Sequence, residues 1–326
     1  MSPTRVSAVI PHWNRRDLLK TLLENLREQD RPFDEIIVVD NGSTDGSAEL
    51  AEDYGSRAIR LATNQGFAAA VNRGIEAATG DWIAILNNDV TLDPAWLATL
   101  LEQKADALFA TGKILSAADP RIIDGTFDEI SRGACALRCG AGKPDSTYWN
   151  HPRPIRFAPM TAALFRRDLF YEVGLLDESF GSYLEDVDFG LRCAARGRSG
   201  VYLPGAVAYH VGSATHGAWK SDTVRLLSRN QILLAVKHFR GFPRWPIVAG
   251  QLLWGLVALR HGAGLAWLRG KVSGLRVSRK NRGELLADQQ LKLRSIVDAS
   301  ERAIREVQQQ TGFDAYWRAY FCVLRR

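Results

Sequence analysis

The segment VSAVIPHWNRRDLLKTLLENL, residues 6–26, is the most informative about the fold because it joins two different hydrophobic periodicities. It opens with a short apolar run that stops at Pro11, as a buried strand would. Leucines then recur three and four positions apart, which predicts an amphipathic helix over residues 16–28. A strand that leads at once into a helix is typical of alternating α/β folds.

The same alternation continues to residue 86. Strand-like runs occupy residues 36–39, 58–61 and 82–86, and helices are expected at 47–54 and 68–78. The joints between them are short, as in a parallel sheet with helices on both faces. We therefore predict an α/β fold built on a mostly parallel, Rossmann-like sheet.

The second half of the chain is less regular. Residues 133–159 indicate loop and irregular sheet, followed by a helix at 185–196, a strand at 200–209 and basic helices from residue 223. We predict two parts: a catalytic domain over residues 1–225 and a helical C-terminal extension over residues 226–326.

Composition and charge exclude several classes. The net charge of +6 is uneven, because no Asp or Glu occurs between Thr223 and Arg282. Such a stretch favours an anionic partner, but no nucleic-acid-binding module accompanies it, so nucleic acid is not expected. The apolar residues 246–259 fall short of the roughly 20 that a spanning helix needs. Four cysteines without metal-ligand spacing favour reduced thiols in the cytoplasm.

Polar residues follow each of the first four predicted strands. Any one such cluster is ordinary turn chemistry. The carboxyl ends of parallel strands share one edge of a sheet, however, and that edge is where such folds bind ligands. The four clusters are residues 12–14, 40–43, 64–67 and 87–89. Together they predict a ligand site at this edge.

Two common nucleotide motifs are missing from the sequence. No G-x-G-x-x-G follows the first strand, and no G-x-x-x-x-G-K-[ST] occurs anywhere. A bound diphosphate would therefore need another source of positive charge. A divalent cation held by carboxylate is the expected choice, because hard cations prefer oxygen ligands.

Five strings occur in order: VSAVIPHWNR, IIVVDNGSTDGS, NQGFAAAVNRGI, LNNDV and DESFGSYLEDVDFGLR. Together they resemble the family 2 inverting glycosyltransferases of GT-A fold, especially the rhamnosyltransferase-like branch, over roughly residues 6–230. The resemblance implies non-processive transfer of rhamnose or a similar sugar from a dTDP- or UDP-sugar. The acceptor would be a hydroxyl of a glycan or lipid-linked molecule in cell-envelope polysaccharide synthesis.

The resemblance also implies which residues bind the donor. Asp40 would accept the imino N–H of a pyrimidine base, although an Asx-turn also explains an aspartate there. Pro11, His12 and Asn14 would line the base and ribose pocket. The wall near the ribose and diphosphate would be formed by Asn64, Gly66 and Asn72.

A metal site is implied at Asn87-Asn88-Asp89, where the family often has Asp-x-Asp. Asp89 would ligate Mn²⁺ or Mg²⁺ against the two phosphates, while Asn87 and Asn88 would contact the donor. His210, after the strand at 200–209, would complete the metal sphere, as a histidine there does in several relatives. A purely structural role for His210 stays open.

Three carboxylates open the helix predicted at 185–196. Acidic residues are favoured at a helix N-terminus for electrostatic reasons alone, which accounts for one or two of them. The resemblance implies that Asp186 is the general base that deprotonates the acceptor hydroxyl. Glu185 and Asp188 would lie on the acceptor side, positioning either the acceptor or the helix.

The basic residues 240–282 include Trp and Leu at many positions. Basic helices with an apolar face can lie in a membrane interface. They can equally cover the core domain with their charges solvated, and both interpretations stay open. The first would place a cytoplasmic protein peripherally on the inner face of the cell membrane.

Three other functions are less consistent with the sequence. A processive synthase usually has spanning helices and a Q-x-x-R-W motif, and this sequence has neither. A nucleotidyltransferase usually has a Gly-rich basic loop after its first strand, which IPHWNRRD is not. A catalytically silent protein that binds nucleotide-sugars or anionic surfaces would have no need of both Asp89 and Asp186.

Overall fold

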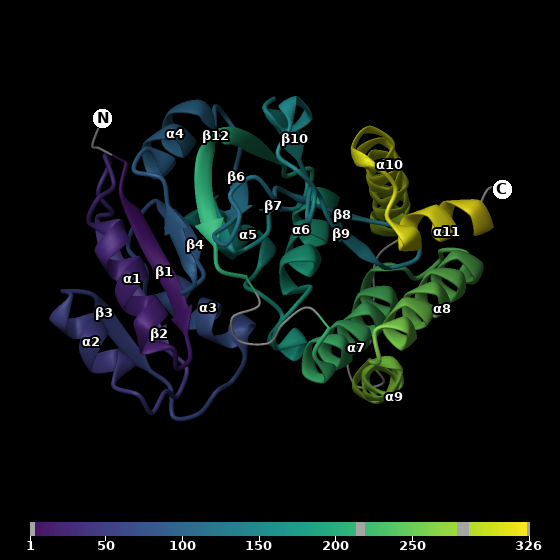
Figure 1. Ribbon diagram of the computed structural model, residues 1–326, viewed down its shortest axis with the longest axis horizontal. Helices are drawn as coiled ribbons and strands as arrows, with labels where there is room; N and C mark the ends of the chain where they lie inside the picture. The colour runs from purple at the N-terminus through teal and green to yellow at the C-terminus, as the bar shows by residue number, and fades with distance from the viewer. Residues whose placement is uncertain (1–3, 213–218, 279–286, 325–326) are drawn as a thin grey trace. The chain divides into compact units, whose positions relative to one another are not determined.

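The computed structural model describes residues 4–212, 219–278 and 287–324, and its first half shows the expected alternation (Figure 1). Each of these seven elements begins and ends within two residues of its predicted range. They are β1 (Val6–His12), α1 (Arg16–Leu26), β2 (Glu35–Asp40), α2 (Ser47–Asp53), β3 (Arg57–Arg60), α3 (Phe67–Ala77) and β4 (Trp82–Leu86).

Later strands extend β1–β4 into a ten-stranded sheet within the described residues, ordered β10-β12-β6-β11-β4-β1-β2-β3, with β5 on β12 and β7 on β6. The added strands are β5 (Val90–Leu92), β6 (Phe109–Ser116), β7 (Ile123–Gly125), β10 (Arg153–Ile155), β11 (Ala162–Arg166) and β12 (Gly200–His210). Strands β1 to β4 pair in parallel, as do β6 and β12, whereas β11 is antiparallel to both neighbours. The predicted α/β fold with parallel central strands is confirmed.

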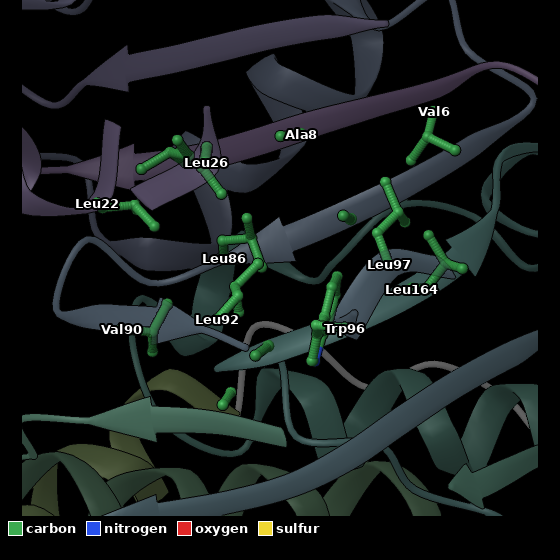
Figure 2. Packing of buried hydrophobic residues seen from close by; sticks show 14 of the residues in the cluster. Val6, Ala8, Leu22, Leu26, Leu86, Val90, Leu92, Trp96, Leu97 and Leu164 are labelled. Carbon is green, nitrogen blue, oxygen red and sulfur yellow. The ribbon is translucent and has the colours of Figure 1, made fainter. Parts of the chain in front are cut away.

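Helices cover both faces of this sheet, because successive strand residues point to opposite sides. Val6, Ala8 and Ile10 join the leucines of α1 and Trp96 of α4 (Trp96–Gln103) in one buried cluster, part of which Figure 2 shows. On the other face α3 lies so close that a Cβ on Gly74 would be 2.2 Å from Val9.

An aromatic cluster fixes the helix that begins at Glu185. Phe165 on β11 lies 5.6 Å from Phe170 on α5 (Arg167–Val173) and 6.0 Å from Phe189 on α6 (Glu185–Ala195), measured between ring centroids. Phe170 and Phe189 stack at 4.9 Å. Buried aromatic pairs of this kind contribute about 0.5–1.5 kcal/mol beyond their buried area, so the start of α6 is held firmly to the sheet.

The chain forms two compact units. The sheet unit comprises Met1–Phe127 and Gly140–Gly212, and the helical unit comprises Asp128–Cys139 and Ser213–Arg326. The boundary predicted after residue 225 therefore falls inside α7 (Ser221–His238). The sequence analysis also did not foresee that the hairpin of β8 (Asp128–Ile130) and β9 (Ala136–Arg138) groups with the helices.

Hydrogen bonds to a distant helix explain where that hairpin belongs. The N–H of Ile130 donates to Ser300 Oγ at 2.6 Å, and Arg132 forms an ion pair with Glu301 at 2.6 Å. Both partners lie on α10 (Ala287–Thr311), about half the chain away in sequence. Local sequence patterns do not predict a contact between residues so far apart.

The helical unit also contains α8 (Arg244–Arg260), α9 (Gly264–Ser278) and α11 (Ala315–Val323). Glycines let α9 approach α7 closely: a Cβ on Gly270 would be 2.3 Å from the carbonyl oxygen of Arg225. Among the described helices, none combines the length and the apolar character that crossing a bilayer requires.

Candidate active site

Hydrogen bonds join the ends of β1 and β2. The N–H of Asn41 donates to the carbonyl oxygen of His12 at 2.7 Å. Asn14 is in a left-handed conformation (φ 54°), with its N–H donating to Ser43 Oγ at 2.8 Å and its Oδ1 accepting from Thr44 N–H at 3.1 Å. Asn14 therefore links the two loops that follow these strands.

Asp40 ends β2 and is almost fully buried. Its Oδ1 accepts the N–H of Ser43, three residues further along, at 3.0 Å, so the carboxylate does stabilise the local turn, although over one residue more than the Asx-turn considered from the sequence. The hydrogen bond occupies only part of the carboxylate's accepting capacity, since its two oxygens offer about four lone-pair sites. The turn is therefore compatible with a second hydrogen bond to a ligand.

Asn41 carries the link onward to the end of β3. Its amide nitrogen donates to Asn64 Oδ1 at 3.1 Å and to the carbonyl oxygen of Gly66 at 3.0 Å, and its Oδ1 accepts from Gln65 N–H at 2.8 Å. The sequence analysis did not assign Asn41, although its place beside Asp40 was a signal. All three contacts shape the loop that contains Asn64 and Gly66.

Gly66 brings this loop against the segment that precedes α6. Its φ is 93°, and a Cβ there would lie 2.9 Å from the backbone of Gly181. The N–H of Ala68 also donates to the carbonyl oxygen of Gly181 at 2.9 Å. Any side chain at position 66 would therefore push apart the edge of the sheet and the start of α6.

His12 connects the end of β1 to the end of β4. Its Nδ1 lies 2.8 Å from the amide nitrogen of Asn88. Burial lowers the pKa of His12 to about 4, against smaller opposing effects of Asp45 and Asp40, so the imidazole is neutral at pH 7. If Nδ1 accepts from Asn88, the proton is on Nε2, and Nε2 is buried with no hydrogen-bond partner among the described residues.

Asp89 and Asp124 lie on either side of His210. His210 Nε2 is 3.1 Å from Asp89 Oδ1, and its Nδ1 is 2.9 Å from Asp124 Oδ2. Burial lowers the pKa of His210, but hydrogen bonds to Asp124 and Asp89 outweigh burial and raise it to about 9. The end of β12 is thereby tied to the loop after β4 and to β7.

Asp89 and His210 meet several requirements of a divalent-cation site. Asp89 Oδ1 and His210 Nε2 are 3.1 Å apart, near enough that both could hold one divalent cation. A metal-binding histidine commonly donates its other N–H to a carboxylate, as Asp124 allows here. No three His, Cys, Asp or Glu side chains converge on one point in the described ranges, so other ligands would come from water or substrate phosphates.

The start of α6 carries the three predicted acidic residues, and they differ in environment. Asp188 is fully buried and pairs with Arg192 Nε at 2.9 Å, whereas Glu185 is buried in the first turn. Asp186 is half-buried, and its Oδ1 accepts the N–H of Val187 at 2.8 Å. Of the three, Asp186 is the one residue that is not buried.

The family model described as "Glycosyl transferase family 2" matches residues 7–174, which is more than half of the chain. The chain belongs to glycosyltransferase family 2. The family resemblance expected from the sequence motifs is thereby confirmed.

Several curated relatives of this glycosyltransferase have informative names. The N-acetylglucosaminyl-diphospho-decaprenol L-rhamnosyltransferase of Mycobacterium tuberculosis is 27% identical over 244 residues, covering 65% of this chain and 79% of that protein. The O-antigen biosynthesis protein RfbC of Myxococcus xanthus is 31% identical over 211 residues, covering 59% of this chain and 16% of that protein. EpsH of Bacillus subtilis is 36% identical over 110 residues, only 32% of either chain.

Two solved structures confirm the GT-A fold. GalNAc-T7, solved with UDP, GalNAc and Mn²⁺, has a TM-score of 0.65 at 13% identity, covering 95% of this chain and 58% of that one. The mannosyltransferase PcManGT of Pyrobaculum calidifontis, solved with GDP-Man and Mn²⁺, has a TM-score of 0.54 at 17% identity, covering 98% and 86%. At such identities the likeness concerns the fold alone.

Three residues expected at the donor site take part in the packing or hydrogen bonding of the protein itself. Pro11 is buried within β1, and the N–H of Asn87 donates to the carbonyl oxygen of Thr161 at 2.9 Å. Asn72 is buried, and its amide group donates to the carbonyl oxygen of Leu176 and to Glu178, while its Oδ1 accepts from Leu176 N–H. Asn72 thus fixes the loop before α6.

Arg192 of the glycosyltransferase holds the adjoining residues of this loop. Besides pairing with Asp188, its guanidinium donates to the carbonyl oxygens of Val173, Gly174 and Leu175 at 2.8–3.1 Å. Asp188 therefore has a clear positioning role, which the sequence analysis allowed. Arg192 was not among the predicted residues, although its spacing four residues after Asp188 was a signal.

Two consecutive residues before α6 are in the left-handed region, Tyr183 (φ 73°) and Leu184 (φ 68°). For residues with side chains this conformation costs roughly 1–2 kcal/mol each. Such strain persists only where the surroundings enforce it, and it is concentrated at functional sites. Here it sets the direction from which Asp186 enters the first turn of α6.

Proposed function

We propose that this glycosyltransferase transfers rhamnose or a similar hexose from a dTDP- or UDP-sugar to a hydroxyl of a glycan or lipid-linked acceptor, with inversion and one sugar per encounter. The observation that carries the proposal is the hydrogen-bonded edge of the sheet. His210 contacts Asp89, and the neighbouring Asn88 contacts His12. The backbone of His12 is bonded to Asn41, which in turn holds Asn64 and Gly66. Gly66 lies against Gly181, in the segment that leads into α6.

The donor half of the proposal is supported by His12. Leaving a buried donor without an acceptor costs about 1–3 kcal/mol, so a ligand oxygen accepting from Nε2 would recover that free energy. Asp40 at the end of the neighbouring strand is the proposed acceptor for a pyrimidine imino group. The names of relatives and of solved neighbours mention rhamnosyl transfer, UDP and GDP-Man, which favours a nucleotide-sugar.

Asp89 and His210 are the proposed ligands for Mn²⁺ or Mg²⁺, with Asp124 orienting the imidazole. Such a cation supplies positive charge that stabilises a departing nucleoside diphosphate. GalNAc-T7 and PcManGT were both solved with Mn²⁺, which supports this choice. Asn87 and Asn88 would contribute neutral amide contacts beside the charge.

Asp186 is the proposed general base. The acceptor oxygen forms the new bond to the anomeric carbon while the bond from that carbon to the diphosphate oxygen breaks, and Asp186 takes the hydroxyl proton. Attack opposite the leaving group inverts the anomeric configuration. The helix N-terminus favours the ionised form of Asp186 that this step requires. Arg192 and Asn72 hold the preceding loop and so position the carboxylate.

The acceptor is proposed from the relatives' names. One acts on a diphospho-decaprenol-linked sugar, and another belongs to O-antigen biosynthesis. Cell-envelope polysaccharide synthesis at the cytoplasmic face of the membrane is consistent with both. Nucleotidyl transfer and silent binding are less favoured, because family membership and the Asp89–His210–Asp124 arrangement together fit sugar transfer.

A thermal-shift panel of nucleotide-sugars tests this proposal. A ligand that binds only the native state raises its stability, so a dTDP- or UDP-sugar should raise the unfolding temperature more with Mn²⁺ than with a chelator. The selected donor is then incubated with a lipid-linked saccharide, and NMR of the product reports its anomeric configuration. A product that retains the donor's configuration would refute the single-displacement step.

A further inference from the structure

Helix α8 exposes an apolar stripe. Trp245, Val248, Leu252, Leu256 and Leu259 are each between 48% and 65% exposed. Their spacings of three and four residues place them on one side of the helix, within about 80° of one another at 100° per residue. Scattered single apolar residues are normal on a protein surface, but an ordered stripe of large ones marks an interaction surface.

Helix α9 repeats the pattern. Leu265, Leu268, Val272 and Leu275 are each between 41% and 61% exposed and follow the same three- and four-residue spacing. Only three residues separate α8 from α9, so the two stripes belong to neighbouring helices. Nine exposed apolar side chains are therefore gathered on this one helix pair.

The inner faces of both helices are already used for packing. A Cβ on Gly255 of α8 would lie 2.7 Å from the indole of Trp267 on α9. A Cβ on Gly274 of α9 would lie 2.7 Å from the carbonyl oxygen of Arg229 on α7. Small residues thus bring the backbones together on the inside, and the large apolar side chains are left on the outside.

The charges on α8 and α9 are of one sign. Neither helix contains an Asp or Glu. Arg244, Arg260, Arg269 and Arg276 are exposed, and within the described residues none of these four forms an ion pair. Arginine side chains of this kind can lie along an apolar surface while the guanidinium reaches the charged headgroup layer.

Because all the charges on α8 and α9 are positive, the partner that binds their outward faces should be negatively charged. In a second copy of the chain, four guanidiniums would meet four more with no acidic group on either helix pair, which is repulsive. An anionic lipid bilayer supplies both the apolar layer and the negative charge. We propose that the outward faces of α8 and α9 bind the surface of an anionic bilayer, with the apolar stripes in the interface and the arginines at lipid phosphates.

This surface needs neither donor nor acceptor, so it does not rest on the proposed function and can be tested without catalysis. The test is co-sedimentation of the full chain with vesicles of phosphatidylcholine, with or without phosphatidylglycerol. We expect binding to the anionic vesicles that weakens as salt is raised, because exposed charges are screened. Equal recovery in the supernatant with both vesicle types would overturn the proposal.

Two double variants and a control test separately how the arginines and the apolar residues contribute to vesicle binding. Arg269→Gln with Arg276→Gln should weaken binding by about 25-fold, since each guanidinium near an anionic surface is worth about five-fold. Leu252→Glu with Leu256→Glu should weaken it more than about ten-fold. Tyr171→Ser, which changes an aromatic side chain in the sheet unit that is more exposed than any of the nine, should bind like the unchanged protein. Thermal unfolding of each variant checks that it is folded.

Trp245 supplies a direct signature of insertion. Brominated lipids quench an indole only when it enters the bilayer, so quenching should be largely lost in Trp245→Phe. Sedimentation velocity provides the opposing result: a dimer that Leu252→Glu with Leu256→Glu dissociates, in a protein that binds no vesicles, would assign these faces to self-association and overturn the proposal.

Discussion

The carboxylate of Asp124 lies 2.9 Å from Nδ1 of His210 and so fixes which ring nitrogen faces Asp89. The two residues are 86 positions apart in sequence and meet because β7 and β12 both pair with β6. Asp124 is thereby placed to orient the imidazole of His210, the proposed metal ligand.

Removing this orientation should weaken the metal site. We expect Asp124→Asn to lower Mn²⁺ affinity by about 10- to 100-fold, as loss of such an outer partner commonly does. Isothermal titration of Mn²⁺ in the presence of a nucleoside diphosphate measures the change. Asp119→Asn alters an exposed carboxylate nearby in sequence and serves as the control. Unchanged affinity in Asp124→Asn would leave Asp124 with a structural role only.

Replacing Asp89 should affect donor binding more than replacing Asp124. Asp89→Ala removes the proposed carboxylate ligand, so donor affinity should become nearly independent of Mn²⁺. Titration of the donor with Mn²⁺ and with a chelator makes the comparison. A variant that still binds the donor more tightly with Mn²⁺, by the same factor as the unchanged protein, would show that Asp89 is not a ligand.

The first half of the fold could be predicted because its periodicities are strong. Residues 6–86 alternate between apolar runs and leucine- or alanine-rich helical spacing, and each element was placed within two residues. The direction of β11 could not be foreseen, since an apolar run such as Ala162–Arg166 is the same for either orientation. The placement of the 128–139 hairpin could not be foreseen either, because it depends on Ser300 and Glu301.

The candidate site, like the fold, could be predicted only in part from the sequence. Residues at strand ends, such as His12, Asp40 and Asp89, could be found because topology alone gathers them at one edge. Asp124 gave no local signal, because an aspartate before glycine reads as an ordinary turn. Asn72 was expected at the donor wall, but its hydrogen bonds run to Leu176 and Glu178, more than 100 positions away.

The buried pair of Asp188 and Arg192 should govern stability. Arg192→Met leaves the carboxylate of Asp188 buried without its cation, which should lower the free energy of unfolding by about 3–5 kcal/mol. Urea unfolding measures the loss. Adding Asp188→Asn removes the buried charge and should restore part of the lost free energy of unfolding. If the double variant is as unstable as the single one, the lost carbonyl contacts of Arg192, not the stranded charge, account for the effect.

His12 should make stability depend on pH below neutrality. Its folded pKa of about 4 lies below the ordinary 6.5, so between these values the unfolded chain binds a proton that the native protein does not. The stabilising contribution is complete above pH 6.5 and is lost as pH falls toward 4, by up to about 3 kcal/mol. Unfolding free energies of the unchanged protein and His12→Gln at pH 7 and 4.5 should diverge. Parallel losses would contradict this.

Asp186→Asn tests the account most directly, with Asp168→Asn as a matched control because Asp168 is also the second residue of its helix. The measurement is kcat for transfer alongside the donor Kd in the presence of Mn²⁺. We predict that Asp186→Asn lowers kcat by about 10²- to 10⁴-fold while the donor Kd changes little, and that Asp168→Asn alters neither. Undiminished turnover in Asp186→Asn would contradict the assignment of the base and, with it, the proposed chemistry.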